Sequence, residues 1–433
     1  MRKRGPEYRW AVLGVAFFGV FGALGFGRFG YSAVLPSMQK ALGLSSAAAG
    51  SLASWNLAGY TVMAAIGGVL AARLSPRRVI TAGILTTALG MVITGVAGSL
   101  ATASAGRFIT GLGNGVVLVP SITLMAAWFK ARRLGLASGV VSTGSSLALV
   151  VVGLAVPRII SAGGADGWRY AWYFFAGVTL VMAILSAVLQ LDRPQRGGHR
   201  GGELVLPRSA PLALRARMPR PSLELKRIFH SRFAWHLGAI YMFYGLAFLI
   251  YFTFFQKRLT SDLGYSPKSA GYFFLLVGVA GLIGGVLWGS VSDRVGRRRT
   301  IALTLALAGT ASLLFGLSRG IPSLAISAIL FGSTGPVVPG LVGAACSEEF
   351  GYRLASASLG FVTVLVGLGQ TIGPYLGGVL ADASSSLGPT YVFSGALFLA
   401  GATGALALGN ARSDASKTTQ KLPALPQGRW PIR

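Results

Sequence analysis

Acidic residues are scarce in this chain: its 433 residues include 11 Asp and Glu against 39 Lys and Arg, for a formal net charge of +28. A single cysteine, Cys346, excludes an internal disulfide and a cysteine metal site. Charged residues make up only 12% of the chain and hydrophobic residues 53%, a balance that excludes an ordinary water-soluble domain. No grouping of a nucleophile with a base, and no metal-ligand cluster, is apparent. We therefore expect a membrane protein that is not an enzyme and needs no metal or cofactor.

Long apolar stretches dominate what is present. A helix needs about 20 apolar residues to cross the hydrocarbon layer of a bilayer. Twelve stretches meet this requirement, at residues 10–36, 47–71, 79–99, 103–128, 135–160, 170–190, 233–256, 269–291, 300–318, 321–346, 354–382 and 389–409. The sequence predicts an all-α membrane protein with twelve transmembrane helices.

The basic residues are sorted by membrane side. Thirty of the 39 Lys and Arg lie in the N-terminal tail, in the loops that follow even-numbered stretches and in the C-terminal tail. By the positive-inside rule, we expect both termini to lie in the cytoplasm. We expect the protein to lie in the inner membrane. Because topology accounts for the basic surplus, we do not expect the nucleic-acid binding that a high net charge otherwise indicates.

One long polar interval divides the chain. Residues 191–232 carry five prolines and ten basic residues, which is typical of a linker. We expect an N-terminal six-helix bundle at 1–190, this cytoplasmic linker at 191–232, a C-terminal six-helix bundle at 233–409 and a disordered cytoplasmic tail at 410–433. Two bundles of this kind typically rock against each other around a central site.

A loop motif occurs twice. After the eighth stretch the chain reads G-x-x-x-D-R-x-G-R-R, and a degraded copy without the aspartate follows the second stretch. The glycine permits two helices to approach closely, and the aspartate can pair with an arginine or a helix end, so we expect a latch that holds one access state shut. The predicted gating residues are Gly289, Asp293, Arg294, Gly296, Arg297 and Arg298.

This loop motif, its position and the six-plus-six layout resemble the major facilitator superfamily. The run Arg107-Phe-Ile-Thr-Gly111-Leu-Gly113 is similar to that family's R-x-x-x-G-x-G element in the fourth crossing. The resemblance implies a solute carrier that works by alternating access, with a cavity lined mainly by crossings 1, 4, 7 and 10. Within the superfamily, residues 128–145 and 347–351 and the Leu380-Ala381-Asp382 run resemble the monocarboxylate and oxalate/formate branch.

The chain departs from that branch in its charged residues. Members usually carry an arginine in crossing 8, and the oxalate exchangers add a lysine in crossing 11, but residues 269–291 and 354–382 contain neither. The charged residue that this chain has in their place is Arg28, in the first crossing. It resembles the anion-binding arginine of organophosphate and organic-anion carriers. An arginine inside a membrane helix costs about 2.5 to 3.5 kcal/mol on insertion scales and normally faces a water-filled cavity or a partner. Its planar fork suits a carboxylate, although a structural role at the interface or at helix-end carbonyls is the alternative.

Other polar residues in the crossings are weaker candidates, because an isolated polar side chain often bonds between helices and an aromatic stripe is often core packing. Asn56 and Tyr60 are four residues apart and share one helix face, and Asn114 follows Arg107 by seven residues, two turns along one face. The substrate-binding residues predicted with Arg28 are Tyr31, Asn56, Tyr60, Arg107, Asn114, Tyr241, Tyr244, Phe248, Tyr251 and Gln370.

These features predict a secondary transporter of small organic anions, in particular monocarboxylates. No Asp or Glu lies deep inside a crossing, so we expect either exchange against a counter-anion or cotransport in which a proton travels with the bound anion. The protein is expected to act in the bilayer as a monomer. A multidrug or sugar carrier of the same fold, or a membrane sensor or scaffold without transport activity, remains an alternative.

Overall fold

The computed structural model describes residues 7–129, 131–192 and 228–408, and within them every regular element is a helix. The first helix group comprises α1 (Tyr8–Val20), the π-helical stretch η1 (Phe21–Phe29), α2 (Gly30–Ala41), α3 (Ser46–Leu74), α4 (Pro76–Val96), α5 (Leu100–Gly115), α6 (Leu118–Trp128), α7 (Ala131–Gly163), the 3-10 turn η2 (Gly164–Asp166) and α8 (Gly167–Leu189). The second helix group comprises α11 (Arg232–Lys257), η3 (Arg258–Asp262), α12 (Pro267–Val295), α13 (Arg297–Leu317), α14 (Ile321–Thr334), η4 (Gly335–Val337), α15 (Val338–Ser384) and α16 (Gly388–Ala407).

Serine caps set several of these helix starts. The Ser45 hydroxyl accepts a hydrogen bond from the Ala48 amide at the start of α3, and Ser99 forms a reciprocal capping box with Thr102 at the start of α5. Such caps satisfy N–H groups that the first helical turn leaves without a partner. Gly351, at φ +70, interrupts α15 near its first third, a backbone conformation that glycine adopts without strain.

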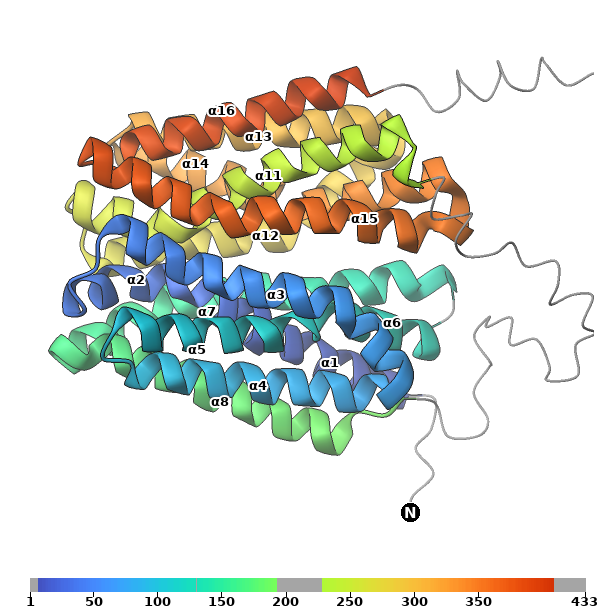
Figure 1. Ribbon diagram of the computed structural model, residues 1–433, viewed down its shortest axis with the longest axis horizontal. Helices are drawn as coiled ribbons and strands as arrows, with labels where there is room; N and C mark the ends of the chain where they lie inside the picture. The colour runs from blue at the N-terminus through green and yellow to red at the C-terminus, as the bar shows by residue number, and fades with distance from the viewer. Residues whose placement is uncertain (1–6, 130, 193–227, 409–433) are drawn as a thin grey trace, which may run out of the picture.

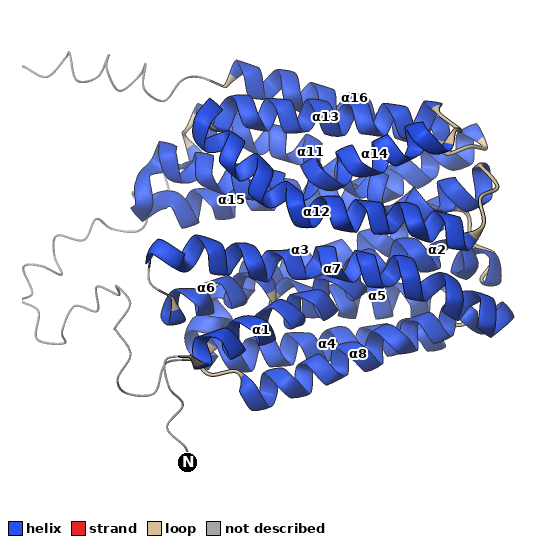
Figure 2. Ribbon diagram, turned by 180° about the vertical axis from the view of Figure 1, so that it is seen from behind, coloured by secondary structure: helices blue, strands red, loops and turns tan. Residues whose placement is uncertain are grey.

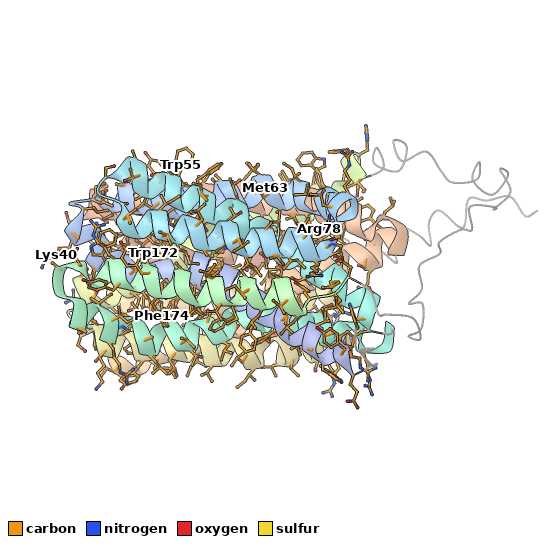
Figure 3. All side chains as sticks on the ribbon, turned by 90° about the horizontal axis from the view of Figure 1, so that it is seen from below. Lys40, Trp55, Met63, Arg78, Trp172 and Phe174 are labelled. Carbon is orange, nitrogen blue, oxygen red and sulfur yellow. The ribbon has the colours of Figure 1, made fainter. Side chains whose placement is uncertain are left out.

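The two helix groups lie side by side with their helices running in roughly the same direction (Figure 1, with the reverse view in Figure 2). Lys40 lies at one end of the molecule and Arg78 at the other (Figure 3). We refer below to the Lys40 end and the Arg78 end. The chain starts its first described helix at the Arg78 end.

The all-α membrane fold predicted from the sequence is confirmed, and helices occupy each of the twelve predicted ranges. Ten candidate membrane spans are found in the described part of the chain by length and composition. One of them, Leu136–Leu189, has 54 residues and contains both α7 and α8. The number of twelve crossings and the domain boundaries stay predictions. Most of the predicted linker 191–232 and the predicted tail 410–433 lie outside the described residues.

Close contacts join the groups along three pairs of helices, and the most extensive are α3 with α15 and α7 with α12, followed by α2 with α11. The two most extensive contacts depend on glycines. A Cβ on Gly50 of α3 would lie 2.1 Å from the carbonyl oxygen of Pro374 in α15, and one on Gly153 of α7 would lie 2.5 Å from the carbonyl oxygen of Gly271 in α12. Backbone-to-backbone packing of this kind is typical of helices that associate within a membrane.

Polar contacts reinforce the α3–α15 contact at the Lys40 end. The carboxylate of Asp382 accepts hydrogen bonds of 2.8 Å from the backbone amides of Ser46 and Ala47, the first residues of α3. The Lys257 ammonium, from α11, donates to the Ser46 hydroxyl at 2.6 Å. A carboxylate is favoured there because the N-terminal amides of a helix lack internal partners and carry partial positive charge. We call these four residues the Asp382 clasp.

The buried apolar residues show where the groups share a core. One large cluster contains residues from both groups, such as Tyr31 and Phe252. The first-group residues nearer the Arg78 end, such as Val12 and Ile80, form a separate cluster that includes no second-group residue. The groups are therefore packed together toward the Lys40 end and have separate cores toward the Arg78 end.

The predicted gating loop lies between α12 and α13. Gly296 adopts φ +93 there, and Arg297 pairs with Asp293 at 2.8 Å and with Glu348 of α15 at 2.8 Å. The expectation that Gly289 marks a close helix approach is wrong for this structure, because no atom lies within 4 Å of a Cβ built on it. Both ion pairs join elements of the second group, and the gating role of Arg294, Arg298 and the other motif residues stays a prediction.

Candidate functional site

Arg28 lies in η1, where the backbone forms a π-helix over nine residues. π-Helical turns are rare and occur frequently at functional sites. Glycines let this stretch pack directly on α7: a Cβ on Gly25 would lie 2.1 Å from the Cβ of Ala148. This tight packing fixes the position at which the Arg28 side chain leaves the backbone.

The guanidinium of Arg28 meets neutral partners. Its Nη2 donates a hydrogen bond of 2.8 Å to Oε1 of Gln370 in α15, which joins the two helix groups. Its Cζ lies 5.1 Å from the ring centroid of Tyr60 and 5.3 Å from that of Phe29. An aromatic face stabilises a cation without neutralising it.

Arg107 from α5 is almost fully buried, with 1% of its surface exposed. Its Nη1 donates to the carbonyl oxygen of Gly27 at 2.6 Å, and its Cζ lies 4.8 Å from the ring of Tyr31 and 5.3 Å from the ring of Trp172. The side-chain nitrogen of Asn56 donates to the Arg107 carbonyl oxygen at 3.0 Å. The second arginine is thus held rigidly beside the residue that precedes Arg28.

Both arginines line one pocket between the helix groups. Its walls are Arg28, Phe29, Tyr31, Ser32, Ala53, Asn56, Leu57, Arg107, Leu249, Phe252 and Thr253. The enclosed volume of the pocket is small in this structure, about 10 Å³, and the value rises to about 270 Å³ only when the open solvent at its mouth is included. None of the lining residues is acidic, and among the described residues neither arginine makes an ion pair with a carboxylate.

Several polar atoms in the pocket wall are buried without a hydrogen-bond partner. They are the Nε atoms of Arg28 and Arg107, the hydroxyl of Ser32 and the side-chain oxygen of Asn56. A buried donor without a partner is costly, about 1 to 3 kcal/mol for a neutral group and more for a charged one. Native proteins tolerate few buried polar atoms without a partner, and these four lie around one pocket. The two Nε atoms and the Ser32 hydroxyl can donate, whereas the Asn56 oxygen is an acceptor. The pocket therefore has the donors that an anionic ligand requires.

The structure brings Arg28, Tyr31, Asn56 and Arg107 together in this pocket, and places Tyr60 and Gln370 against Arg28. The aromatic residues of α11 form a stacked row, with ring centroids 5.5 Å apart for Tyr241 and Tyr244 and 5.3 Å apart for Tyr244 and Phe248. Tyr244 also donates to the carbonyl oxygen of Gly335 at 2.9 Å.

Two predicted site residues lie elsewhere in this structure. Tyr251 bonds to the Ser327 hydroxyl at 2.7 Å and stacks on Phe331 at 3.6 Å, within the second group. Asn114 is fully buried outside the pocket, next to the carbonyl oxygens of Ala23 and Thr110. The amide orientation that satisfies these neighbours turns the side-chain nitrogen toward them, at 2.8 Å from Ala23 and 3.0 Å from Thr110. Both side chains have their polar atoms satisfied by the protein.

Sequence reasoning missed three polar or aromatic participants. Ser32 and Thr253 line the pocket, and Trp172 stacks on Arg107. Ser32 follows Arg28 by four residues, a spacing that places both on one helix face, so this residue was open to prediction. Nothing in the sequence indicates that α8 and α11 supply Trp172 and Thr253.

An all-helical, multi-pass membrane protein with a cationic pocket between two helix groups belongs to the solute-carrier class. The family model described as "Uncharacterised MFS-type transporter YbfB" matches residues 20–405. The chain therefore belongs to this family of major facilitator superfamily transporters, as the sequence motifs predicted. The family and the relatives that this chain resembles are named as transporters.

Named relatives cover most of the chain at moderate identity. The probable sulfoacetate transporter SauU of Cupriavidus necator is 25% identical over 88% of this chain and 89% of its own length. Monocarboxylate transporter 13 of Rattus norvegicus is 26% identical over 90% and 87%, and the cis,cis-muconate transport protein of Acinetobacter baylyi is 24% identical over 84% and 86%. These identities and coverages confirm the resemblance to the monocarboxylate branch.

Solved structures confirm the fold. A bacterial homologue of the human lysosomal transporter Spinster has a TM-score of 0.70 at 15% identity, over 98% of this chain and 100% of that one. A D-xylose-proton symporter has a TM-score of 0.70 at 18% identity, over 93% and 98%.

Proposed function

We propose that this protein is a secondary transporter that moves small organic anions through the membrane by alternating access, with Arg28 as the main charge partner. The observation that carries the proposal is the pocket of Arg28 and Arg107, which has buried donors without partners and no acidic residue in its wall. Carboxylates and sulfonates match the planar fork of a guanidinium. Relatives named for sulfoacetate, muconate and monocarboxylates support the same choice of solute.

The proposal also includes the orientation of the protein in the membrane. The protein lies in the inner membrane. Its Arg78 end faces the cytoplasm, because the basic loops lie at this end. The two six-helix bundles, 1–190 and 233–409, move as units around the pocket. The Asp382 clasp and the shared core at the Lys40 end describe a state that is closed to the outside, and the separate cores at the Arg78 end favour opening to the cytoplasm. Protons or a counter-anion supply the coupling, and the protein acts as a monomer.

Uptake into proteoliposomes tests this function. Radiolabelled acetate, succinate and sulfoacetate are compared with glucose and a lipophilic cation, using wild type, Arg28→Ala and Arg28→Lys. We expect saturable uptake of anions by wild type and a loss of at least tenfold in Arg28→Ala, because one charged hydrogen bond contributes about 1.5 to 3 kcal/mol.

The matched control is Arg158→Ala, since Arg158 is an exposed arginine of α7 outside this pocket, and it should transport as wild type does. Uptake of glucose or the cation instead of anions would support the sugar or multidrug alternative. Anion binding without any flux would support the sensor alternative. Equal anion uptake by wild type and Arg28→Ala would remove Arg28 from the site.

A further inference from the structure

The pocket holds two positive charges rather than one. Arg107 donates to the carbonyl oxygen of Gly27, the residue before Arg28, and both side chains line the same wall. Both side chains carry a positive charge, and like charges that share one buried pocket repel each other. Within the described residues their polar partners are an amide, backbone carbonyls and aromatic rings, none of which carries a negative charge.

A ligand with one acidic group balances only half of this charge. A buried charge without a counter-charge is unfavourable, because the low dielectric of the interior strengthens repulsion and removes water. A monocarboxylate bound to Arg28 would leave Arg107 uncompensated, with only 1% of its surface exposed. A ligand with two acidic groups neutralises both arginines.

The unpartnered donors are distributed to match two acidic groups. One Nε is on Arg28 and one is on Arg107, and both are buried without a partner. The Ser32 hydroxyl, also without a partner, lies one helical turn beyond Arg28 and lines the same pocket. Carboxylate and sulfonate oxygens accept several hydrogen bonds at once, so two such groups would satisfy donors that one group leaves free.

We propose that the pocket selects organic dianions, with one acidic group bound by Arg28 and the second by Arg107, and with the Ser32 hydroxyl donating to the ligand. This inference rests on the proposed function and narrows its substrate class.

A pair of ligands with the same carbon skeleton tests the charge count. Succinate and malonate each carry two carboxylates at pH 7, and their monomethyl esters carry one. Binding to the purified full-length protein is measured by isothermal titration. We expect each diacid to bind at least about tenfold more tightly than its half-ester, the equivalent of one charged hydrogen bond. This comparison uses wild type and does not depend on a variant that folds poorly.

Variants assign the two charges. Arg107→Gln should weaken diacid binding about tenfold and leave half-ester binding nearly unchanged, which abolishes the preference, whereas Arg107→Lys should keep part of it. Arg28→Gln should weaken both ligands. Thermal unfolding of each variant controls for loss of the packing around Arg107.

Half-esters that bind wild type as tightly as the diacids would overturn the dianion inference and leave the anion-transport proposal standing. Equal weakening of both ligands by Arg107→Gln in a folded variant would likewise remove Arg107 from ligand binding. If none of the anions binds, the proposed function fails and the inference fails with it.

Discussion

At the scale of single residues, the character of the site depends on the partner of Arg28 being an amide. Gln370 accepts one hydrogen bond from the guanidinium at 2.8 Å and leaves its charge uncompensated. A carboxylate at the same position would form an ion pair and compete with a bound anion. The neutral partner therefore positions the arginine and keeps it available for a ligand.

Gln370→Glu should abolish most anion transport. The new carboxylate would lie within hydrogen-bond reach of Arg28 and neutralise it, so we expect the initial rate of anion uptake into proteoliposomes to fall at least about tenfold. Gln370→Met, which has a similar volume and no charge, serves as the control and should retain more activity than Gln370→Glu. Wild-type rates in Gln370→Glu would contradict the assignment of Arg28 as the charge partner.

Asn114→Ala should affect stability and leave substrate binding nearly intact. The Asn114 amide bonds to backbone carbonyl oxygens of η1 and α5 outside the pocket, so its removal leaves buried acceptors without partners. The loss is about 1 to 3 kcal/mol of unfolding free energy. Thermal unfolding in detergent and anion titration measure the two effects separately. A large loss of affinity at an unchanged unfolding midpoint would instead place Asn114 in the site.

Part of the site was predictable from spacing and charge. The four-residue separation of Asn56 and Tyr60 predicted one shared helix face, and in the structure Asn56 lines the pocket and Tyr60 lies beside Arg28. Their role in substrate binding stays a prediction. The aromatic stripe of α11 does lie on one helix face, yet Tyr251 meets Phe331 of α14 rather than Arg28. Helical periodicity gives the face that a residue occupies, whereas the neighbour opposite that face depends on tertiary packing.

At the scale of elements, the contact of α3 with α15 joins the two helix groups at the Lys40 end, and in the proposed transport cycle it keeps this end closed. Glycines allow the two backbones to touch, and the Asp382 clasp adds charge-assisted hydrogen bonds to the N-terminus of α3. Contacts that differ between two conformations set their relative populations. In this structure the clasp is formed, so it stabilises the state with the Lys40 end closed.

Asp382→Asn should shift the population toward a state that is open at the Lys40 end. The replacement removes the charge that faces the α3 amides, and we expect roughly a tenfold change in the open population. Because Cys346 is the one native cysteine, Cys346→Ala provides a background for labelling a pocket residue through Ser32→Cys. The measurement is the rate of labelling by an impermeant thiol reagent from the Lys40 side.

The control is Asp262→Asn in the same background. Asp262 lies at the same end but pairs with Arg258 within the second group, at 3.0 Å, so its change should leave the labelling rate nearly as in wild type. Equal labelling rates in the background protein and in Asp382→Asn would show that the clasp does not hold this end closed.

At the scale of the whole molecule, hydropathy and charge sorting were sufficient to predict the fold. Helices occupy the predicted ranges because lipid favours segments whose backbone hydrogen bonds are all internal. Of the breaks within the helices, η4 in the tenth predicted crossing coincides with Gly335 and Pro336, a pair that favours a kink, whereas no periodicity in the sequence marks η1 in the first crossing. The two helix groups share a core at the Lys40 end and have separate cores at the Arg78 end. This arrangement likewise depends on packing between segments that are distant in the sequence.

The central claim is that a guanidinium between two helix groups, paired with an amide rather than an acid, binds an organic anion. Isothermal titration of purified wild type and Arg28→Gln with succinate and sulfoacetate, alongside glucose and tetraphenylphosphonium, tests it most directly. The account predicts that wild type binds at least one of the anions and neither of the other solutes, and that Arg28→Gln loses this binding. Tight binding of the sugar or the cation, or unchanged anion affinity in Arg28→Gln, would contradict it.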